Sequence, residues 1–275
     1  MRIGNKDFNV NNNVYVMGIL NVTPDSFSDG NKYNTIDKVM YQIERMIEEG
    51  VDIIDVGGES TRPGHVKISD EEEIERVVPI IEIINKIYDI PVSIDTYKAN
   101  VAKAAFMAGA DMLNDIWGLL YRDNMVDGHN KLAEYVKKYN AVVCLMHNDE
   151  KVMIKNNMSN VCNRLNKSIN EALKYGIDRD KIMVDPGIGF AKTYENNLYV
   201  MKNLDKLKSL GYPILLGTSK KSMIGMALDA DIDNRLEGTI ATTVYGMEKG
   251  ISFVRVHDVL ENVRAIKMIQ AIKNI

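Results

Sequence analysis

The amino-acid sequence predicts an α/β protein with one domain over residues 1–275, folded as a (β/α)₈ (TIM) barrel. Short apolar or β-branched runs alternate with segments that have the spacing of amphipathic helices, and the alternation repeats eight times. Such alternation favours a parallel sheet, and eight units within roughly 250 residues are typical of a closed barrel. An open doubly wound sheet is the alternative, but no Gly-x-Gly-x-x-Gly pattern follows the first predicted strand.

The predicted strands are short, and each is followed by a predicted helix. We expect strands at 14–20, 52–56, 91–94, 111–114, 141–146, 181–184, 213–216 and 252–255. We expect helices at 35–49, 70–88, 98–108, within 122–138, 158–175, 194–210, 221–228 with 235–249, and 258–275. Active sites of such barrels lie at the C-terminal ends of the strands, so the residues just after each strand are the functional candidates.

Composition argues against several classes of protein. A net charge of −4 gives no general attraction to nucleic acid or to a membrane surface, so we expect neither as a partner. No run approaches 18 apolar residues and the N-terminus has no apolar signal core, which predicts a cytoplasmic protein. Cys144 lies in an apolar run and is expected in the core, and Cys162 is isolated, so neither indicates a disulfide or a metal cluster.

Polar or charged residues follow nearly every predicted strand. A single such residue has a plain structural explanation, because an Asp after a strand is often the N-cap of the next helix. In a barrel, however, all of these side chains would converge on one mouth. The candidates in chain order are Asn21, Arg62, Asp95, Asn114, His147, Asp185, Lys221, Arg255 and His257.

The candidates fall into two chemical groups. Asp95, Asn114 and Asp185 offer hydrogen-bond acceptors together with one amide donor, which suits a flat heterocycle with several N–H groups. Lys221, Arg255 and His257 follow the seventh and eighth strands, where barrels commonly bind phosphate.

A divalent cation fits the first strand end. Asn21 has a neutral oxygen suited to Mg²⁺, which takes one or two protein oxygens and completes its shell with phosphates and water. No set of His and Cys residues has the spacing of a zinc site.

Two segments after strands are long and specific: Asn-Val-Thr-Pro-Asp-Ser-Phe-Ser-Asp-Gly at 21–30 and Gly-Gly-Glu-Ser-Thr-Arg-Pro-Gly at 57–64. Shorter motifs occur at 93–96 (Ser-Ile-Asp-Thr), 114–115 (Asn-Asp), 185–190 (Asp-Pro-Gly-Ile-Gly-Phe), 221–222 (Lys-Ser) and 255–257 (Arg-Val-His). In these motifs the chain closely resembles the dihydropteroate synthases of folate biosynthesis. The resemblance runs from the first strand to the eighth.

The resemblance implies a (β/α)₈ barrel that joins 6-hydroxymethyl-7,8-dihydropterin diphosphate to p-aminobenzoate and releases pyrophosphate. It also implies Mg²⁺ as cofactor and a homodimer. The implied catalytic residues are Asn21, as the Mg²⁺ ligand, and Lys221, Arg255 and His257. The implied pterin pocket consists of Asp95, Asn114, Asp185 and Lys221, with Met146 as an apolar wall. The implied pyrophosphate clamp is Arg255-Val256-His257, and the implied p-aminobenzoate contacts are Phe27, Thr61, Arg62, Pro63, Phe190 and Ser222.

A mechanism follows from this resemblance. An arylamine is largely neutral at pH 7, so the difficult step is cleavage of the C–O bond at the pterin methylene. We expect the enzyme to stabilise the charge that grows on pyrophosphate, while Asp95 and Asp185 face a pterin ring that becomes cationic. The segment at 21–30 is expected to act as a lid that excludes water.

Departures and alternatives remain. Lys220 stands where the family usually has Arg, which puts a bidentate contact in doubt, and the segment at 147–157 has no assignable motif. A methyltetrahydrofolate methyltransferase would share the Asp/Asn pocket but has no use for 61–63 or for the Arg255/His257 pair. A non-catalytic pterin binder would be expected to lack the metal and pyrophosphate residues. A phosphosugar barrel would not need three heterocycle contacts.

Overall fold

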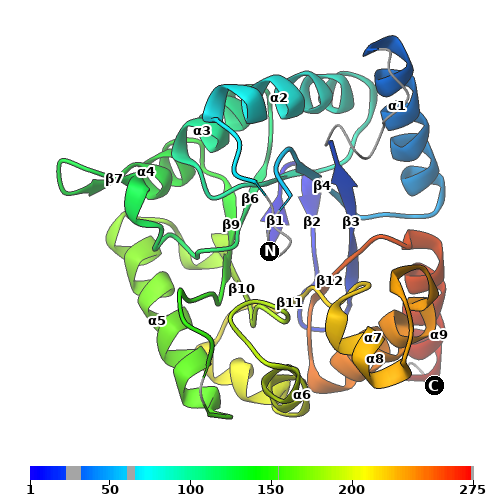
Figure 1. Ribbon diagram of the computed structural model, residues 1–275. Coiled ribbons are helices and arrows are strands. Elements are labelled where there is room, and N and C mark those ends of the chain that lie inside the picture. The colour runs from blue at the N-terminus through cyan, green and yellow to red at the C-terminus, as the bar shows by residue number, and fades with distance from the viewer. Residues whose placement is uncertain (23–31, 61–65, 154, 274–275) are drawn as a thin grey trace.

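The structure is a computed structural model that describes residues 1–22, 32–60, 66–153 and 155–273. An eight-stranded parallel sheet lies at its centre, and helices surround it (Figure 1). The strands are β3 (Tyr15–Asn21), β4 (Ile53–Gly57), β5 (Val92–Asp95), β6 (Met112–Asp115), β9 (Val142–Met146), β10 (Ile182–Asp185), β11 (Leu215–Leu216) and β12 (Phe253–Val256). They pair in the order β10–β9–β6–β5–β4–β3–β12–β11, and a parallel bridge between Val184 and Ile214 joins the two edges. The predicted barrel is confirmed.

Most strands begin one residue later than predicted and include the polar residue at their C-terminal end. Two of the excluded first residues are acids that cap a neighbouring strand: Asp52 Oδ2 accepts from the Val16 N–H at 2.7 Å, and Asp111 Oδ2 from the Val92 N–H at 3.0 Å. At the other end, Asp95 and Asp185 are the last residues of β5 and β10. These candidate side chains therefore stand on the rigid sheet and not on loops.

The helices cover the outside of the barrel. They are α1 (Lys32–Glu48), α2 (Asp70–Ile87), α3 (Ala99–Met107), α4 (Lys131–Lys138), α5 (Met158–Lys174), α6 (Tyr194–Lys202), α7 (Ser222–Leu228), α8 (Leu236–Lys249) and α9 (Val259–Lys273). Within the described ranges, none of them combines the length and apolarity needed to cross a membrane.

One predicted helix is interrupted, whereas the helix expected within 122–138 is confirmed as α4. The helix expected at 194–210 ends after Lys202, and a 3₁₀ helix (Leu204–Leu210) follows. Asn203 stands at the break, where its Nδ2 donates to the Tyr199 carbonyl and competes with the backbone ladder. In the region 122–138, a hairpin of β7 (Met125–Val126) and β8 (His129–Asn130) precedes α4, because Asp127-Gly128 has the positive φ angles of a tight hairpin turn.

A second hairpin closes the N-terminal end of the barrel. It consists of β1 (Arg2–Ile3) and β2 (Lys6–Asp7), and the N-terminus lies over the middle of the barrel in Figure 1. Ile3 and Phe8 are buried against side chains that the strands point inward, namely Met17, Ile53, Met112, Val142, Cys144, Met183, Leu215 and Phe253. The expected burial of Cys144 is confirmed. A larger apolar cluster fills the layer between the strands and the helices.

Candidate active site

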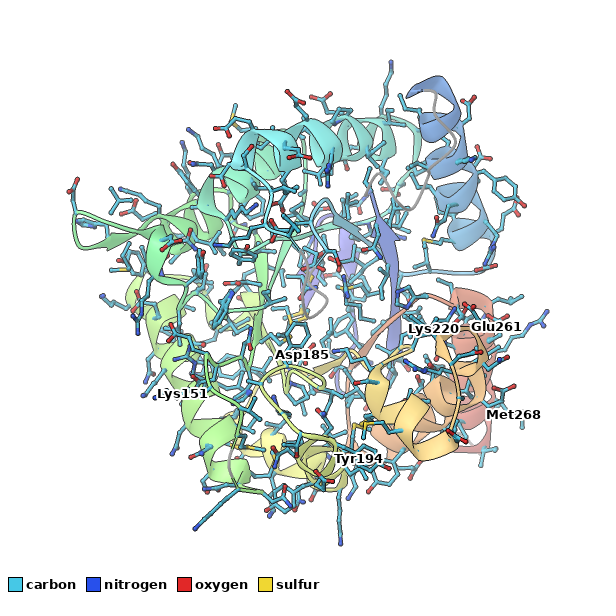
Figure 2. All side chains as sticks on the ribbon, viewed as in Figure 1. Lys151, Asp185, Tyr194, Lys220, Glu261 and Met268 are labelled. Atoms are coloured by element: carbon cyan, nitrogen blue, oxygen red, sulfur yellow. The ribbon has the colours of Figure 1, made fainter. Side chains whose placement is uncertain are left out.

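Three predicted pterin contacts lie at the C-terminal mouth of the barrel. Asp95, Asn114 and Asp185 are each at most 7% exposed, and Asp95 pairs with Asn114 in the register of β5 and β6. Figure 2 shows Asp185 near the centre of the ring of strands. A Cβ atom at Gly57 would lie 3.6 Å from both Asn21 Oδ1 and Asp95 Cβ, so this glycine allows Asn21 to approach the same mouth.

A network of charged side chains joins four strands at the mouth. Arg255 donates from Nε to Asp55 Oδ2 at 2.6 Å and from Nη2 to Asp95 Oδ2 at 2.5 Å. The same Asp55 oxygen accepts from Asn114 Nδ2 at 3.1 Å. One guanidinium and one carboxylate therefore fix the orientation of two predicted pterin contacts.

Asp55 is a residue of this network that the sequence analysis did not single out. It is fully buried on β4, within the run Ile53-Ile-Asp-Val56. Strands of a parallel sheet are covered on both faces, so an acid inside such a run requires a buried partner. A single acidic residue inside an apolar strand sequence is therefore the signal by which Asp55 could have been found.

Burial and charge set the protonation of Asp95. Burial raises the pKa of Asp95 to about 7; Arg255 opposes this shift, while the like charges of Asp55 and Glu73 add to it. The pKa of Arg255 lies above its ordinary value because the two aspartates outweigh the effect of burial. The cationic guanidinium thus stays charged between two acids, and the proton that moves near neutral pH belongs to Asp95.

The second group lies at the ends of β10 and β11. Lys221 Nζ donates to the Ile188 carbonyl and lies 4.7 Å from the centre of the Phe190 ring. Burial lowers the pKa of Lys221 to about 8, against the attraction of Asp185. Burial raises the pKa of Asp185, and Lys221 is the largest opposing influence. The predicted pterin contacts Asp185 and Lys221 are thus electrostatically coupled, with the Phe190 ring beside them.

A half-buried lysine holds the segment that carries Phe190. Lys192 Nζ lies 2.8 Å from both the Gly187 carbonyl oxygen and His147 Nδ1, and 3.0 Å from the Phe190 carbonyl oxygen. Burial lowers the pKa of Lys192 to about 7. His147 follows β9, and burial together with the Lys192 charge lowers its pKa to about 3. The neutral imidazole therefore accepts a hydrogen bond from the ammonium.

The expected phosphate-binding residues come from β12 and the start of α7. His257 Nδ1 lies 3.0 Å from Ser219 Oγ, which also accepts from the His257 backbone N–H. Ser222 is exposed at the first turn of α7. The Val256 side chain packs in the outer core, so any ligand contact of Val256 would use its backbone.

Lys220 has a structural partner. Its Nζ lies 3.0 Å from Asp258 Oδ1, and Figure 2 shows it toward the C-terminal helices, apart from Asp185. Its φ of 55° is left-handed, and its carbonyl accepts from Arg235 Nη1. A single ion pair with Asp258 does not require the planar fork of an arginine.

An apolar wall completes the mouth. Met146 is buried with Tyr97 and Ile116, and the half-buried Phe190 packs against this cluster, as do Trp117 and Tyr121. The predicted apolar role of Met146 is compatible with this position. Four predicted p-aminobenzoate contacts lie outside the described residues: Phe27, Thr61, Arg62 and Pro63.

Among the residues that the structure describes, no group of three or more His, Cys, Asp or Glu side chains is arranged to hold a metal ion. A cation at Asn21 would therefore depend on ligand oxygens and water for most of its shell. This is the usual mode for Mg²⁺ beside a phosphorylated substrate.

Comparison with known proteins shows the family of this chain. The family model described as pterin binding enzyme matches residues 17–257. The dihydropteroate synthase of Clostridium beijerinckii is 56% identical and that of Bacillus subtilis 47% identical; the alignments cover 98% and 94% of this chain and 97% and 88% of those proteins.

Solved structures agree as well. A dihydropteroate synthase from Clostridium difficile, crystallised in the presence of pteroic acid, superposes with a TM-score of 0.91 at 48% identity, over 97% of this chain and 99% of that one. The enzyme from Xanthomonas albilineans in complex with 7,8-dihydropteroate superposes with a TM-score of 0.86 at 34% identity, over 96% and 95% of the two chains.

The barrel, its buried acceptor set and the family match define a pterin-binding enzyme. The chain belongs to the dihydropteroate synthases, which condense a dihydropterin with p-aminobenzoate to give dihydropteroate.

Proposed function

We propose that this chain condenses 6-hydroxymethyl-7,8-dihydropterin diphosphate with p-aminobenzoate, and that residues at the mouth of the barrel bind the pterin ring, the diphosphate and p-aminobenzoate. The observation that carries the proposal is the buried set of Asp95, Asn114 and Asp185 at the ends of three strands. Such acceptors are costly to bury without donors, and a pterin ring brings several N–H groups. Lys221 and the Met146 wall complete this proposed pterin pocket.

The leaving group is the second proposed role. Arg255, His257 and the Val256 backbone stand at the end of β12, and we assign them to the diphosphate. Asn21 would hold Mg²⁺, which would neutralise negative charge on the departing pyrophosphate. The acids Asp95 and Asp185 stabilise positive charge as it develops on the pterin ring, and Lys221 balances Asp185. The reaction is then driven from the leaving-group side.

The acceptor is the third proposed role. The Phe190 ring, the exposed Ser222, and Phe27, Thr61, Arg62 and Pro63 are assigned to p-aminobenzoate. Its amine is a neutral nucleophile, so no general base is assigned. The half-buried Phe190 and the exposed Ser222, which stand apart from the buried pterin contacts, support this assignment.

We also propose that the enzyme is cytoplasmic and homodimeric, with small molecules as its substrates and no nucleic-acid or membrane partner. The moderate net charge of −4 supports the last point. Sedimentation of the purified chain tests the dimer, since a monomer at all concentrations would contradict it.

The decisive experiment measures pyrophosphate release from the pterin diphosphate and Mg²⁺, with and without p-aminobenzoate. We expect release that requires p-aminobenzoate and yields dihydropteroate, and loss of activity when the metal is chelated. Asn21→Ala should raise the Mg²⁺ concentration needed for half-maximal rate while leaving binding of the unphosphorylated pterin unchanged. Tight pterin binding without pyrophosphate release would instead identify a non-catalytic binder.

A further inference from the structure

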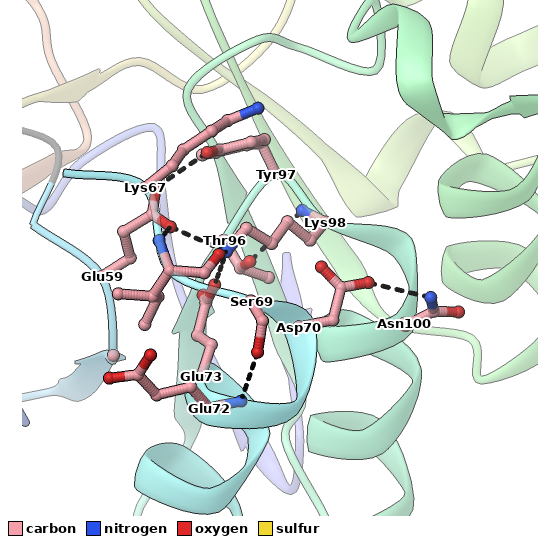
Figure 3. Close-up of polar contacts among 12 residues, drawn as sticks. Glu59, Lys67, Ser69, Asp70, Glu72, Glu73, Thr96, Tyr97, Lys98 and Asn100 are labelled. Atoms are coloured by element: carbon pink, nitrogen blue, oxygen red, sulfur yellow. Dashed lines mark hydrogen bonds and ion pairs between the residues drawn. The ribbon is translucent and has the colours of Figure 1, made fainter.

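A buried charge cluster lies beside the mouth and has no part in the proposed chemistry (Figure 3). Lys98 Nζ lies 2.7 Å from Glu59 Oε2, 2.8 Å from Glu73 Oε2 and 2.7 Å from the Ile68 carbonyl oxygen. The Tyr97 hydroxyl donates to Glu59 Oε1 at 2.7 Å. The side chains of Lys98, Glu59 and Glu73 are 8%, 3% and 1% exposed.

Forming this cluster costs free energy of desolvation, because one cation and two carboxylates are removed from water. Burial raises the pKa of Glu73, and Lys98 only partly offsets this. The pKa of Glu59 is nevertheless lowered, since its hydrogen bonds to Lys98 and Tyr97 outweigh its burial. The ionised Glu59–Lys98 pair is therefore the stable centre of the cluster. Since well-packed apolar residues are often as stable as a buried ion pair, the cluster points to a role besides stability.

The pair connects three elements near the mouth. Glu59 follows β4, Ile68 precedes the Ser69 N-cap of α2, and Lys98 is the N-cap residue of α3. The Ile68 N–H donates to Glu59 Oε2 at 3.1 Å, so Glu59 and Lys98 together hold both the N–H and the C=O of Ile68. The two described ends of the connection between β4 and α2 are thereby joined at one point.

The pair also reaches the apolar wall. Glu59 fixes the hydroxyl of Tyr97, whose ring belongs to the cluster that Phe190 packs against. Lys67, on the α2 side of the connection, lies 4.9 Å from the Tyr121 ring centre and 5.5 Å from that of Tyr97. The aromatic wall and the connection therefore share the same support.

We infer that Lys98 is a positioning residue for p-aminobenzoate: through Glu59 it fixes Ile68 and Tyr97, and so the wall on which Phe190 rests. This inference rests on the proposed function, which assigns Phe190 to p-aminobenzoate. Lys98 touches neither substrate in this assignment. Its loss should therefore affect the acceptor and spare the pterin.

The test compares Lys98→Met with the wild type in three measurements: the Kd of the pterin diphosphate without acceptor, the KM of p-aminobenzoate, and kcat. We expect the KM of p-aminobenzoate to rise about tenfold or more, since small misplacements near a reacting group are costly. The Kd of the pterin diphosphate should change less than about twofold. Lys249→Met is the control, because it removes an ion pair with Asp205 on the outer helices.

Glu59→Gln covers the case in which Lys98→Met fails to fold. This variant keeps the shape of the side chain and an oxygen that accepts from Tyr97. Its NH2 group then faces Lys98 and the Ile68 N–H and cannot accept from them, so the same rise in KM is expected. Equal effects on both substrates, or none in either variant, would overturn the inference. A wild type that makes no dihydropteroate would contradict the proposed function itself, and the two failures are thus distinct.

Discussion

Arg255 forms ion pairs with two buried aspartates, Asp55 and Asp95, and these contacts influence the protonation of Asp95. Burial raises the pKa of Asp95 to about 7, and the like charge of Asp55, which shares the same guanidinium, adds to this shift. The ionised form of Asp95 is the one that accepts N–H groups from a pterin. Binding of the pterin diphosphate should therefore weaken as the pH falls through about 7.

At the scale of this residue, we predict that Asp55→Asn shifts that pH dependence to more acidic values. The change removes a like charge and leaves Arg255 to pair with Asp95 alone, and both effects lower the pKa of Asp95. The measurement is the Kd of the pterin diphosphate across about pH 5 to 8, a range that includes the raised pKa. Asp52→Asn is the matched control, because Asp52 comes just before the first residue of β4, at the end of the strand away from the mouth. An unchanged midpoint in Asp55→Asn would contradict the prediction.

At the scale of elements, the contact between Lys192 and His147 joins the segments that follow β9 and β10. The pKa of His147 is lowered to about 3, so the native imidazole stays neutral where an unfolded one, with an ordinary pKa near 6.5, would be protonated. The stability that this group contributes is complete above about pH 6.5 and is lost as the pH falls toward 3.

We predict that the free energy of unfolding falls by about 2 kcal/mol more in the wild type than in His147→Gln between pH 7.5 and pH 5. The difference arises over about 1.5 pH units in which the unfolded histidine is protonated and the native one is not. Gln keeps an acceptor for Lys192 and does not titrate, so the difference isolates the histidine from the carboxylates that titrate in the same range. Urea unfolding at both pH values measures it. Parallel losses in the two proteins would mean that His147 is protonated in the native state.

The elements also show how far the sequence alone could lead. The eight strands were predicted because each short apolar run remains recognisable when its ends are misplaced by one residue. The strand-end rule correctly placed Asp95, Asn114 and Asp185 at the mouth of the barrel, and their binding role stays a prediction. The β1–β2 hairpin was missed because strands of two residues have no periodicity to detect. The roles of Asp55, Lys98 and Lys192 depend on partners 39 to 200 residues away or on backbone carbonyls, which no local pattern records.

At the scale of the whole molecule, a hairpin covers the N-terminal end of the barrel, and the proposed site lies at the C-terminal end. The β1–β2 hairpin places Ile3 and Phe8 across the N-terminal end, over an interior filled by side chains of the strands. The proposed pterin contacts lie deepest at the C-terminal mouth, since Asp95, Asn114 and Asp185 are buried, while Phe190 is half-buried and Ser222 is exposed. We therefore expect both substrates to enter and leave at the C-terminal end.

The depth of the proposed pterin contacts therefore has a kinetic consequence. Because the proposed function places p-aminobenzoate at Phe190 and Ser222, we expect it to cover the deeper pterin contacts, so that the pterin diphosphate binds before p-aminobenzoate and leaves after it. We expect an unreactive analogue of p-aminobenzoate to be a competitive inhibitor against p-aminobenzoate and an uncompetitive inhibitor against the pterin diphosphate. An analogue that lowers kcat/KM for the pterin diphosphate would show that the two substrates do not bind in a fixed order.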